Sequence, residues 1–307
     1  IVFLVGPTAV GKSKLAIRLA QLNDMDIVSC DSMQIYKEIN IASDKLLESS
    51  QGGIKHHLID IVSIEDDYNV GRFSKDVHAA VDQIWKENKT PLIVGGSGMY
   101  LQILLDGIFQ DHYSDDKIRN ELEEKVIQNG VESLYQQLQS MDPDAAQKIH
   151  PNDKRRIIRA LEVCQISGKK FSEIKKDREG FWGQVPVLVI GLKRDREELY
   201  QRINARVDQM FEEGLVDEIK NLSHLNFSKS SKGLIGIKEI LGLLDGQYDL
   251  DEAKTLMKRN TRHFAKRQMT WYRGEDRIQW IDLDQFQDDT KVIEHMQQLI
   301  TNMKESL

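Results

Sequence analysis

The chain opens with the stretch IVFLVGPTAVGKSKLAIRLA, residues 1–20, and this stretch decides the fold. Residues 1–5 are apolar and mostly branched, which is typical of a buried parallel strand. Residues 6–13 fit the pattern G-x-x-x-x-G-K-[ST], and residues 14–20 continue as an amphipathic helix. A phosphate-binding loop between a strand and a helix is therefore predicted at the start of the chain.

The loop has the chemistry that a pyrophosphate or polyphosphate needs. Its glycines let backbone N–H groups curl around phosphate oxygens, and the helix that follows adds the positive end of its dipole. Lys12 is expected to neutralise the terminal phosphates, and Ser13 to offer its hydroxyl to Mg²⁺. The phosphate-binding residues predicted from this loop are Gly6, Thr8, Ala9, Val10, Gly11, Lys12 and Ser13.

The bulk composition limits the classes of protein to which the chain can belong. Its 307 residues suffice for one large domain or for a core with an inserted second domain. No apolar run approaches the roughly 18 residues of a spanning helix and no signal peptide is visible, so a cytoplasmic enzyme is expected. Cys30 and Cys164 are the only cysteines, which excludes a cysteine-rich zinc site. The net charge is −7, so a nucleic acid would have to be held by local basic patches.

A carboxylate is expected beside the phosphate-binding loop. Residues 25–30 are predicted to form a second strand, and Asp31 follows it directly. Because ligands of open α/β sheets bind beyond the carboxyl ends of the strands, Asp31 is expected to face the same crevice as the loop. Two site roles remain open: indirect ligand of Mg²⁺, or hydrogen-bond acceptor and general base for an incoming nucleophile. Capping the next turn is the purely structural alternative.

A second glycine-lined loop is predicted at the same edge of the sheet. Residues 91–94 form the next predicted strand and run into residues 95–100, where Ser97 offers a polar contact. Before them, residues 70–87 are predicted to be a helix, whose inner stripe consists of Phe73, Val77, Val81 and Ile84.

A pair of adjacent histidines is one possible sign of a metal site. His56 and His57 are adjacent, so their side chains point to opposite faces of a strand, and no third ligand recurs nearby. A structural or hydrogen-bonding role is therefore favoured.

Residues 111–183 differ in character from the rest of the chain. They are polar, charged and helical in pattern, which predicts a helical insertion domain within an α/β core made of residues 1–110 and 184–307. One helix is expected over residues 115–128, with Gly130 as its C-cap. A second is expected over residues 152–168, with Cys164 on its buried side. This second helix begins with a basic cluster, for which a solvated charged face and an anionic partner remain equally open: Lys154, Arg155, Arg156 and Arg159.

The core resumes with a predicted strand over residues 185–192 and a long helix from Asp195 to near Gly214. Arg202 and Arg206 flank the inner face of that helix. From there an arginine can either reach a pyrophosphate in the crevice or pair with neighbouring acids.

Residues 254–273 are the most basic segment and contain no Asp or Glu. Lys258, Arg262 and Lys266 repeat at i+4, which predicts one uniformly positive helical face. Trp271 and Tyr272 adjoin it. Core packing of these aromatics and contact with a nucleic-acid backbone and an unstacked base are the two alternatives. A last strand over residues 278–283 and a terminal helix over residues 291–304 complete the predicted core.

Eight motifs together resemble the tRNA dimethylallyltransferases, also called tRNA isopentenyltransferases, of the bacterial type. They span nearly the whole chain in the order of that family, at residues 6–13, 31–36, 56–60, 95–100, 155–162, 206–215, 236–239 and 266–273. The resemblance implies an α/β fold in which a P-loop core, with a parallel sheet flanked by helices, carries a helical insertion domain. It also implies that the insertion binds the anticodon stem-loop of a tRNA.

The activity implied by this resemblance is transfer of a dimethylallyl group from dimethylallyl diphosphate to N6 of the adenosine on the 3′ side of the anticodon. By the same resemblance, Asp31 accepts a hydrogen bond or a proton from N6. The departing pyrophosphate is stabilised by Lys12, Arg206 and Ser13 with Mg²⁺. The catalytic set is Asp31, Arg206, Lys12 and Ser97.

The resemblance further implies that the protein binds tRNA. The protein is also expected to be a monomer and, since it has no long apolar run, not to contact a membrane. The implied tRNA-binding positions come from the core and from the insertion. They are Asp31, Ser32, Met33, Gln34, Ser97, Arg119, Arg155, Arg156, Arg159, Gly236, Lys238, Lys266, Arg267, Gln268, Trp271 and Arg273.

The chain departs from the family pattern at a few positions. Ser13 and Ser97 replace the usual threonines but keep the hydroxyl. Ile237 replaces a usual tyrosine, and residues 41–46 differ from the common glycine-threonine-alanine-lysine-proline tract, so substrate contacts at these two places are expected to differ. Two other functions remain open: a small-molecule or nucleotide kinase that consumes ATP, and a non-catalytic RNA-binding module.

Overall fold

The computed structural model describes residues 1–108, 113–174 and 180–305. The chain divides into two compact units, one made of Ile1–Ile103 with Trp182–Leu307 and the other of Leu104–Phe181. The division lies within the helix α3 (Gly98–Asp106), earlier than residue 111. The backbone N–H of Phe181 donates to the carbonyl oxygen of Leu104 at 2.8 Å, so the two ends of the inserted unit are hydrogen-bonded to each other.

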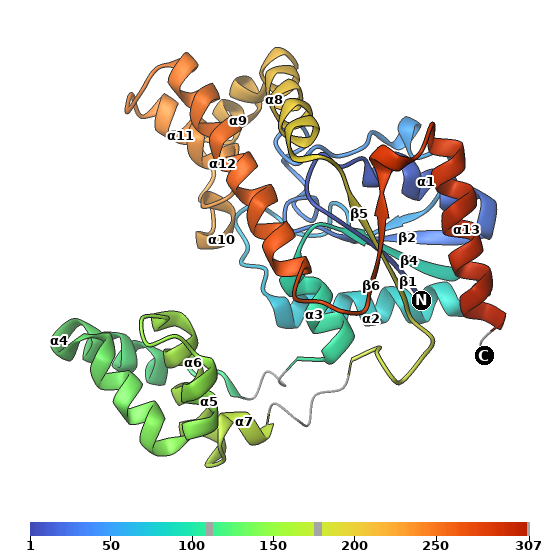
Figure 1. Ribbon diagram of the computed structural model, residues 1–307. Helices are drawn as coiled ribbons and strands as arrows, with labels where there is room; N and C mark the ends of the chain where they lie inside the picture. Colours follow the sequence, from blue (N-terminus) through green and yellow to red (C-terminus); the bar gives the residue numbers. More distant parts are fainter. Residues whose placement is uncertain (109–112, 175–179, 306–307) are drawn as a thin grey trace. The chain divides into compact units, whose positions relative to one another are not determined.

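In the described residues, one sheet of six strands carries the first unit, and all its neighbouring strands are parallel (Figure 1). The strand order is β3-β2-β4-β1-β5-β6. Val5 at the end of β1 pairs with Gly95 of β4 and Gly191 of β5, so the loops after these strands start at one edge. The strands are β1 (Val2–Val5), β2 (Met25–Cys30), β3 (His56–His57), β4 (Thr90–Gly95), β5 (Leu188–Lys193) and β6 (Ile278–Asp282).

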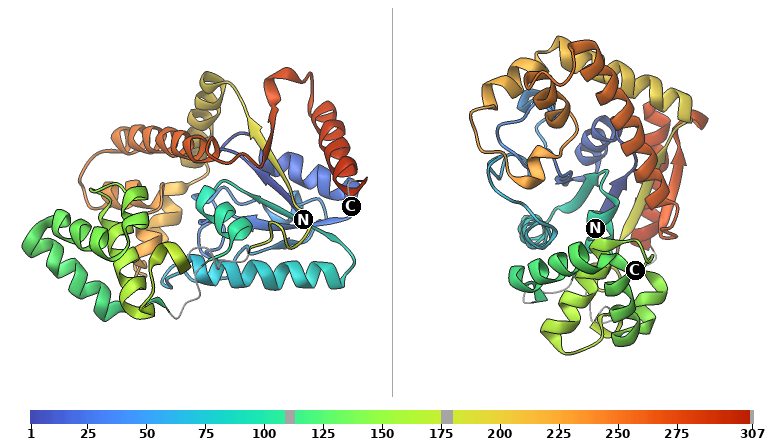
Figure 2. Two further views of the ribbon diagram at one scale, coloured as in Figure 1. Left: turned by 60° about the horizontal axis from the view of Figure 1, so that its bottom comes forward. Right: turned by 90° about the vertical axis from the view of Figure 1, so that its left-hand side faces the viewer.

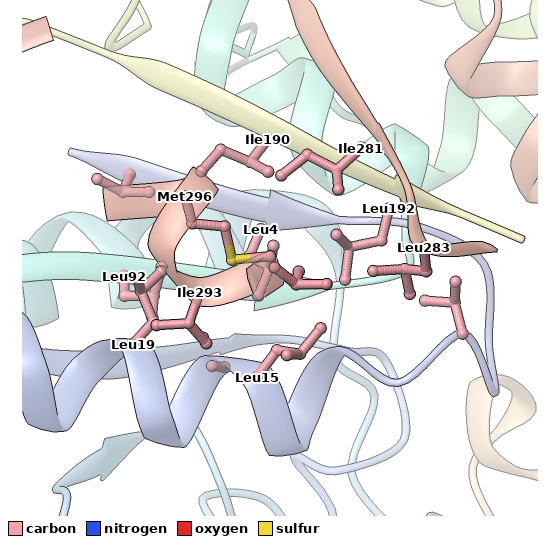
Figure 3. Packing of buried hydrophobic residues seen from close by; sticks show 14 of the residues in the cluster. Leu4, Leu15, Leu19, Leu92, Ile190, Leu192, Ile281, Leu283, Ile293 and Met296 are labelled. Atoms are coloured by element: carbon pink, nitrogen blue, oxygen red, sulfur yellow. The ribbon is translucent and has the colours of Figure 1, made fainter. Parts of the chain in front are cut away.

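Helices cover both faces of this sheet, which explains why its central strands are largely apolar and buried. The helices α1 (Lys12–Asn23) and α13 (Asp289–Glu305) lie on one side, and α2 (Val70–Lys86) lies on the other (Figure 2). On the α1 side, apolar residues of both helices surround Leu4 of β1, among them Leu15, Leu19, Ile293 and Met296 (Figure 3). The inner stripe predicted for α2 is confirmed, because Phe73, Val77, Val81 and Ile84 are fully buried.

The remaining helices of the first unit follow β5. The helix α8 (Arg196–Glu212) ends where predicted, and Gly214, at φ 98°, starts the next helix. The long basic segment lies in α12 (Leu250–Tyr272), which packs against α8. Short helices connect α8 to α12: α9 (Leu215–Leu222), α10 (Lys229–Lys232) and α11 (Ile237–Leu244). A 3₁₀ helix at Glu48–Ser50 lies between β2 and β3, and another at Leu283–Gln285 follows β6.

The inserted unit is helical and has its own core. Its helices are α4 (Asp116–Met141), α5 (Pro143–Lys148), α6 (Lys154–Ser167) and α7 (Phe171–Ile174). Leu122, Leu138 and Leu161 lie in its buried cluster. Gly130 ends the first helical segment of this stretch, as predicted, although a second segment follows it directly. It has φ 78° and ψ 166°, and it breaks α4 into two helical segments.

Cys164 is buried in α6, as predicted. None of the helices in residues 1–108, 113–174 and 180–305 combines the length and the apolar content that a bilayer-spanning helix needs.

Candidate active site

The loop between β1 and α1 has the backbone of a phosphate cradle. Gly6 has φ 153° and Gly11 has φ 111°, backbone angles that residues other than glycine rarely adopt. A Cβ atom on Gly6 would also lie 2.7 Å from the carbonyl oxygen of Leu192. The ammonium group of Lys12 donates to the carbonyl oxygens of Gly6 and Pro7, both at 2.9 Å. The predicted strand–loop–helix is therefore present, with its lysine folded over the loop.

The charge on Lys12 depends on its surroundings. Burial lowers the pKa of its ammonium group to about 8. The carboxylate of Asp31 acts in the opposite direction, and the guanidinium of Arg206 adds to the lowering. An anion that enters beside Lys12 would therefore favour its charged form.

A cavity of about 720 Å³ opens beside this loop, and its walls come from segments far apart in sequence. The P-loop, the residues after β2, the glycine-rich residues after β4, and the helices α8 and α12 all contribute. The lining includes these predicted site residues: Thr8, Ala9, Gly11, Lys12, Ser13, Asp31, Ser32, Met33, Gln34, Ser97, Arg206, Arg267 and Gln268.

Asp31 both caps the local turn, which was its structural alternative, and lies at the predicted site. Its Oδ1 atom accepts a hydrogen bond from the backbone N–H of Met33 at 2.8 Å, so it stabilises the local turn. The residue also lines the cavity. Nearby, the hydroxyl of Ser29 donates to Oε1 of Gln34 at 2.8 Å, which holds the Gln34 amide beside the turn.

Arg202 and Arg206 of α8 lie against the P-loop. Arg202 donates from Nε to the carbonyl oxygen of Ala9 at 2.9 Å. Arg206 donates to Oγ1 of Thr8 at 2.7 Å and to Oδ2 of Asp44 at 2.9 Å. The Nε atom of Arg206 is buried and has no hydrogen-bond partner within the described residues. Arg206 thus reaches the phosphate cradle and pairs with an acid at the same time.

Gln268 joins the two loops of the site. It is 6% exposed, its Oε1 atom accepts from the backbone N–H of Thr8 at 2.9 Å, and its amide nitrogen donates to the carbonyl oxygen of Gly96 at 2.7 Å. Its amide is therefore engaged within the protein. One turn later, Trp271 packs on Gly98, where a Cβ atom would approach the indole to 2.3 Å.

The prediction that one face of α12 is uniformly positive is wrong for Lys254, Lys258 and Arg262, because these cations have partners on α8. Asp208 of α8 forms an ion pair with Lys258 at 2.7 Å and another with Lys254 at 2.8 Å. Arg262 donates to Oδ1 of Asn204 at 2.6 Å. Asp208 and Asn204 of α8 therefore engage these three cations, and the carboxylate of Asp208 offsets part of their charge. Lys266, Arg267 and Arg273 lie further along and are exposed.

The motif at residues 236–239 is mainly structural. The backbone N–H of Gly236 donates to Oε2 of Glu239 at 2.7 Å, and Asn260 donates to the other carboxylate oxygen at 2.7 Å. Ile237, which stands where the family usually has tyrosine, is fully buried. Lys238 is exposed.

In the inserted unit, the predicted arginines fall into two groups. Arg119 and Arg159 form ion pairs with the fully buried carboxylate of Glu162, at 2.9 and 2.7 Å. Arg155 and Arg156 are exposed, and Arg156 lies 3.4 Å from Asp153. The first pair stabilises the unit, whereas the second is accessible to a large anion.

The two histidines differ: His56 has a hydrogen-bonding role, as predicted, whereas His57 Nε2 is buried without a hydrogen-bond partner in the described residues and lies at ion-pair distance from Asp26. His57 Nε2 lies 3.6 Å from Oδ2 of the buried Asp26, whose other oxygen lies 2.9 Å from the ammonium group of Lys89. His56 Nδ1 lies 2.8 Å from the carbonyl oxygen of Ile54. Asp26 is near the start of β2, so this cluster is at the opposite end of the strand from Asp31.

Comparison with known proteins places the chain in a family. The family model described as IPP transferase matches residues 34–275. The chain belongs to the IPP transferase family. The tRNA dimethylallyltransferase of Alkaliphilus metalliredigens is 46% identical over 298 residues, which cover 96% of this chain and 95% of the relative. The family resemblance inferred from the sequence motifs is thus confirmed.

Solved structures agree. The full-length tRNA isopentenylpyrophosphate transferase of Bacillus halodurans has a TM-score of 0.73 and 36% identity, and the match covers 99% of this chain and 97% of that one. A eukaryotic dimethylallyltransferase captured acting on tRNA has a TM-score of 0.84 and 32% identity, over 98% of this chain and 79% of that one. The expected fold of a P-loop core with a parallel sheet is confirmed.

The oxygen donors in the cavity of this IPP transferase fit a Mg²⁺ ion that arrives with a diphosphate. Mg²⁺ usually takes one or two protein oxygens and completes its octahedron with phosphates and waters. Ser13 offers a hydroxyl in the cavity wall, and the carboxylate of Asp31 lines the same space. Within the described part of the chain, no three His, Cys, Asp or Glu side chains form a metal-binding group.

The sequence motifs placed Gln268 among the tRNA contacts and did not reveal its bridging role, and Glu162 and Asp44 were not among the predicted site residues. The bridging role of Gln268 has no local signal, because its partners are 260 and 172 positions away. Glu162 could have been identified from its i+3 spacing to Arg159 on an otherwise apolar helix face. Asp44 stands within the tract that departs from the family pattern, which was the available signal.

Proposed function

We propose that this protein transfers a dimethylallyl group from dimethylallyl diphosphate to N6 of the adenosine that follows the anticodon of a tRNA on its 3′ side. Pyrophosphate is the other product. One observation carries the proposal: a single cavity is lined both by the P-loop with its arginine and by Asp31. A diphosphate and a nucleophile can therefore meet there.

The P-loop side of the cavity binds the leaving group. Backbone N–H groups at the start of α1, the ammonium of Lys12 and the guanidinium of Arg206 face the diphosphate. When the allylic C–O bond breaks, its electron pair remains on the diphosphate oxygen, and these cations stabilise the added charge. A Mg²⁺ ion held by Ser13 supplies further charge neutralisation when bound.

The Asp31 side of the cavity orients the acceptor. The new C–N bond forms as N6 of the adenine attacks the allylic carbon, and N6 then gives up a proton. Asp31 accepts the hydrogen bond from N6 and takes or relays that proton. Ser32, Met33, Gln34 and Ser97 line the same wall and contact the base or its ribose.

Exposed cations and one aromatic side chain bind the rest of the tRNA. Phosphate contacts fix the position of the RNA, and a base taken out of its stack packs on an aromatic ring. Gln268, Arg119 and Arg159 are hydrogen-bonded or ion-paired within the protein and serve as positioning residues, as Gly236 does through its turn. The direct contacts are assigned to Arg155, Arg156, Lys238, Lys266, Arg267, Trp271 and Arg273.

The test is incubation of the purified protein with dimethylallyl diphosphate, Mg²⁺ and unmodified tRNA, followed by nucleoside mass spectrometry. The expected product is an adenosine in which a dimethylallyl group replaces one N6 hydrogen, together with an equal amount of pyrophosphate. A parallel reaction contains ATP in place of the allylic donor. Phosphoryl transfer from ATP, with the adenosine left unmodified, would show that the protein is a kinase.

A further inference from the structure

The guanidinium of Arg206 already has an anionic partner inside the cavity. Oδ2 of Asp44 lies 2.9 Å from Nη1 of Arg206, while Nη2 of the same guanidinium donates to Thr8 of the P-loop. Asp44 lines the cavity together with Lys12. Its charge raises the pKa of the Lys12 ammonium, against the dominant effect of burial, so it also acts on the second cation of the site.

The chain segment that carries Asp44 is fixed by hydrogen bonds to α9 and within the segment itself. The carboxylate of Glu218 in α9 accepts from three successive backbone N–H groups, those of Asn40, Ile41 and Ala42, at 2.7, 2.8 and 2.9 Å. Ser43 donates to the carbonyl oxygen of Ile39 at 2.7 Å. These bonds fix a turn in which Asp44 adopts φ 52°. Aspartate and asparagine tolerate that conformation better than most residues.

We propose that Asp44 is an internal competitor for the diphosphate and sets how tightly the cavity holds it. This proposal rests on the proposed function, because it takes Arg206 as a ligand of the diphosphate. A diphosphate that reaches Arg206 must displace the carboxylate of Asp44 from Nη1, and it then lies beside a like charge. Both effects weaken binding of the donor and speed release of pyrophosphate.

The experiment is calorimetric titration of the intact protein with inorganic pyrophosphate at fixed Mg²⁺. Asp44→Asn keeps the backbone conformation and the size of the side chain and removes its charge. Its matched control is Asp66→Asn, an exposed aspartate outside the cavity that changes the net charge equally. Because the ion pair between Arg206 and Asp44 is partly exposed, we expect the affinity for pyrophosphate to increase roughly two- to fivefold in Asp44→Asn. The affinity of Asp66→Asn should not change.

A double-mutant cycle identifies the partner. In an Arg206→Ala background, Asp44→Asn is expected to lose its effect on pyrophosphate affinity. An unchanged or weaker affinity of Asp44→Asn, an equal gain in Asp66→Asn, or an equal gain without Arg206 would each overturn the proposal. If Arg206→Ala binds pyrophosphate as tightly as the native protein, or if the native protein does not bind it, the diphosphate cradle of the proposed function fails as well.

Discussion

Gln268 illustrates how a single side chain can organise a site that local sequence does not reveal. One amide bonds to the P-loop at Thr8 and to the second loop at Gly96, and the residue is almost completely buried. The spacing of the P-loop predicted which atoms bind phosphate. The relative position of the two loops depends on this amide from α12, and no motif encodes it.

Gln268→Ala is therefore expected to loosen the site without removing a substrate ligand. Leaving the N–H of Thr8 and the carbonyl of Gly96 unpaired costs about 1–3 kcal/mol of unfolding free energy. The loss of alignment should lower kcat by roughly 10- to 100-fold. Steady-state kinetics and thermal melting measure both effects. Thr270→Ala, on an exposed part of the same helix, is the control, and equal kinetics in the two variants would contradict the bridging role.

The lowered pKa values of His56 and His57 should make the stability of the protein depend on pH. Burial is the first cause that lowers the pKa of both His56 and His57, and Lys55 lowers that of His57 further. Below the unfolded value of 6.5, the unfolded chain takes up protons that the folded chain does not. The free energy of unfolding should therefore fall as the pH falls below 6.5.

The pH dependence is measured as the melting temperature between pH 7.5 and about 5. His57→Gln removes one titrating group and should give a shallower fall. His224→Gln, at an exposed histidine, should leave the slope unchanged. A slope in His57→Gln equal to that of the native protein would remove His57 from the explanation.

At the level of elements, long periodic segments were predictable and short ones were not. The strand–loop–helix at the start, the stripe of α2 and the last helix all follow from apolar spacing. The fifth strand begins at Leu188 and not at 185, since Pro186 has no N–H to offer to a sheet. The helices α9, α10 and α11 have eight residues or fewer, and such short helices depend on tertiary packing that no local pattern encodes.

The stability of the inserted unit should depend on a buried carboxylate in α6. Glu162 is fully buried between Arg119 and Arg159 and also accepts from the backbone N–H of Asp115. Glu162→Gln removes the charge that both guanidinium groups need. Because the arginines are about one-third exposed, the cost should be about 1–3 kcal/mol, less than for a fully buried pair.

Thermal or urea unfolding followed by circular dichroism measures this loss. The control is Glu123→Gln, at a half-exposed glutamate 3.9 Å from Lys154, which should cost less than about 1 kcal/mol. Equal stability of the two variants would show that the buried charge network contributes little.

At the level of the whole molecule, the residues proposed to bind the two substrates lie in both units of the chain. The cavity that takes the diphosphate belongs to the first unit, and the exposed Arg155 and Arg156 belong to the second. Net charge could not reveal this division, because the chain carries −7 overall. Which cations are free depends on their neighbours, as the pairing of Lys258 with Asp208 shows.

Replacing both Arg155 and Arg156 by alanine should therefore weaken tRNA binding and leave the KM for dimethylallyl diphosphate unchanged. Loss of two phosphate contacts should make the dependence of log Kd on log salt shallower by about 1 to 2, so the defect is largest at low salt. Filter binding across a salt series measures the slope. Lys148→Ala, an exposed cation of the same unit, is the control, and parallel slopes in all three proteins would exclude phosphate contacts by the arginines.

The central claim is that one cavity activates both the diphosphate and the adenine, with Asp31 acting on the adenine. Single-turnover transfer by Asp31→Asn, with tRNA and pyrophosphate affinities measured on the same preparation, tests it most directly. The expected result is a rate reduced by roughly 10²- to 10⁴-fold with both affinities nearly unchanged. Transfer at close to the native rate would contradict the claim.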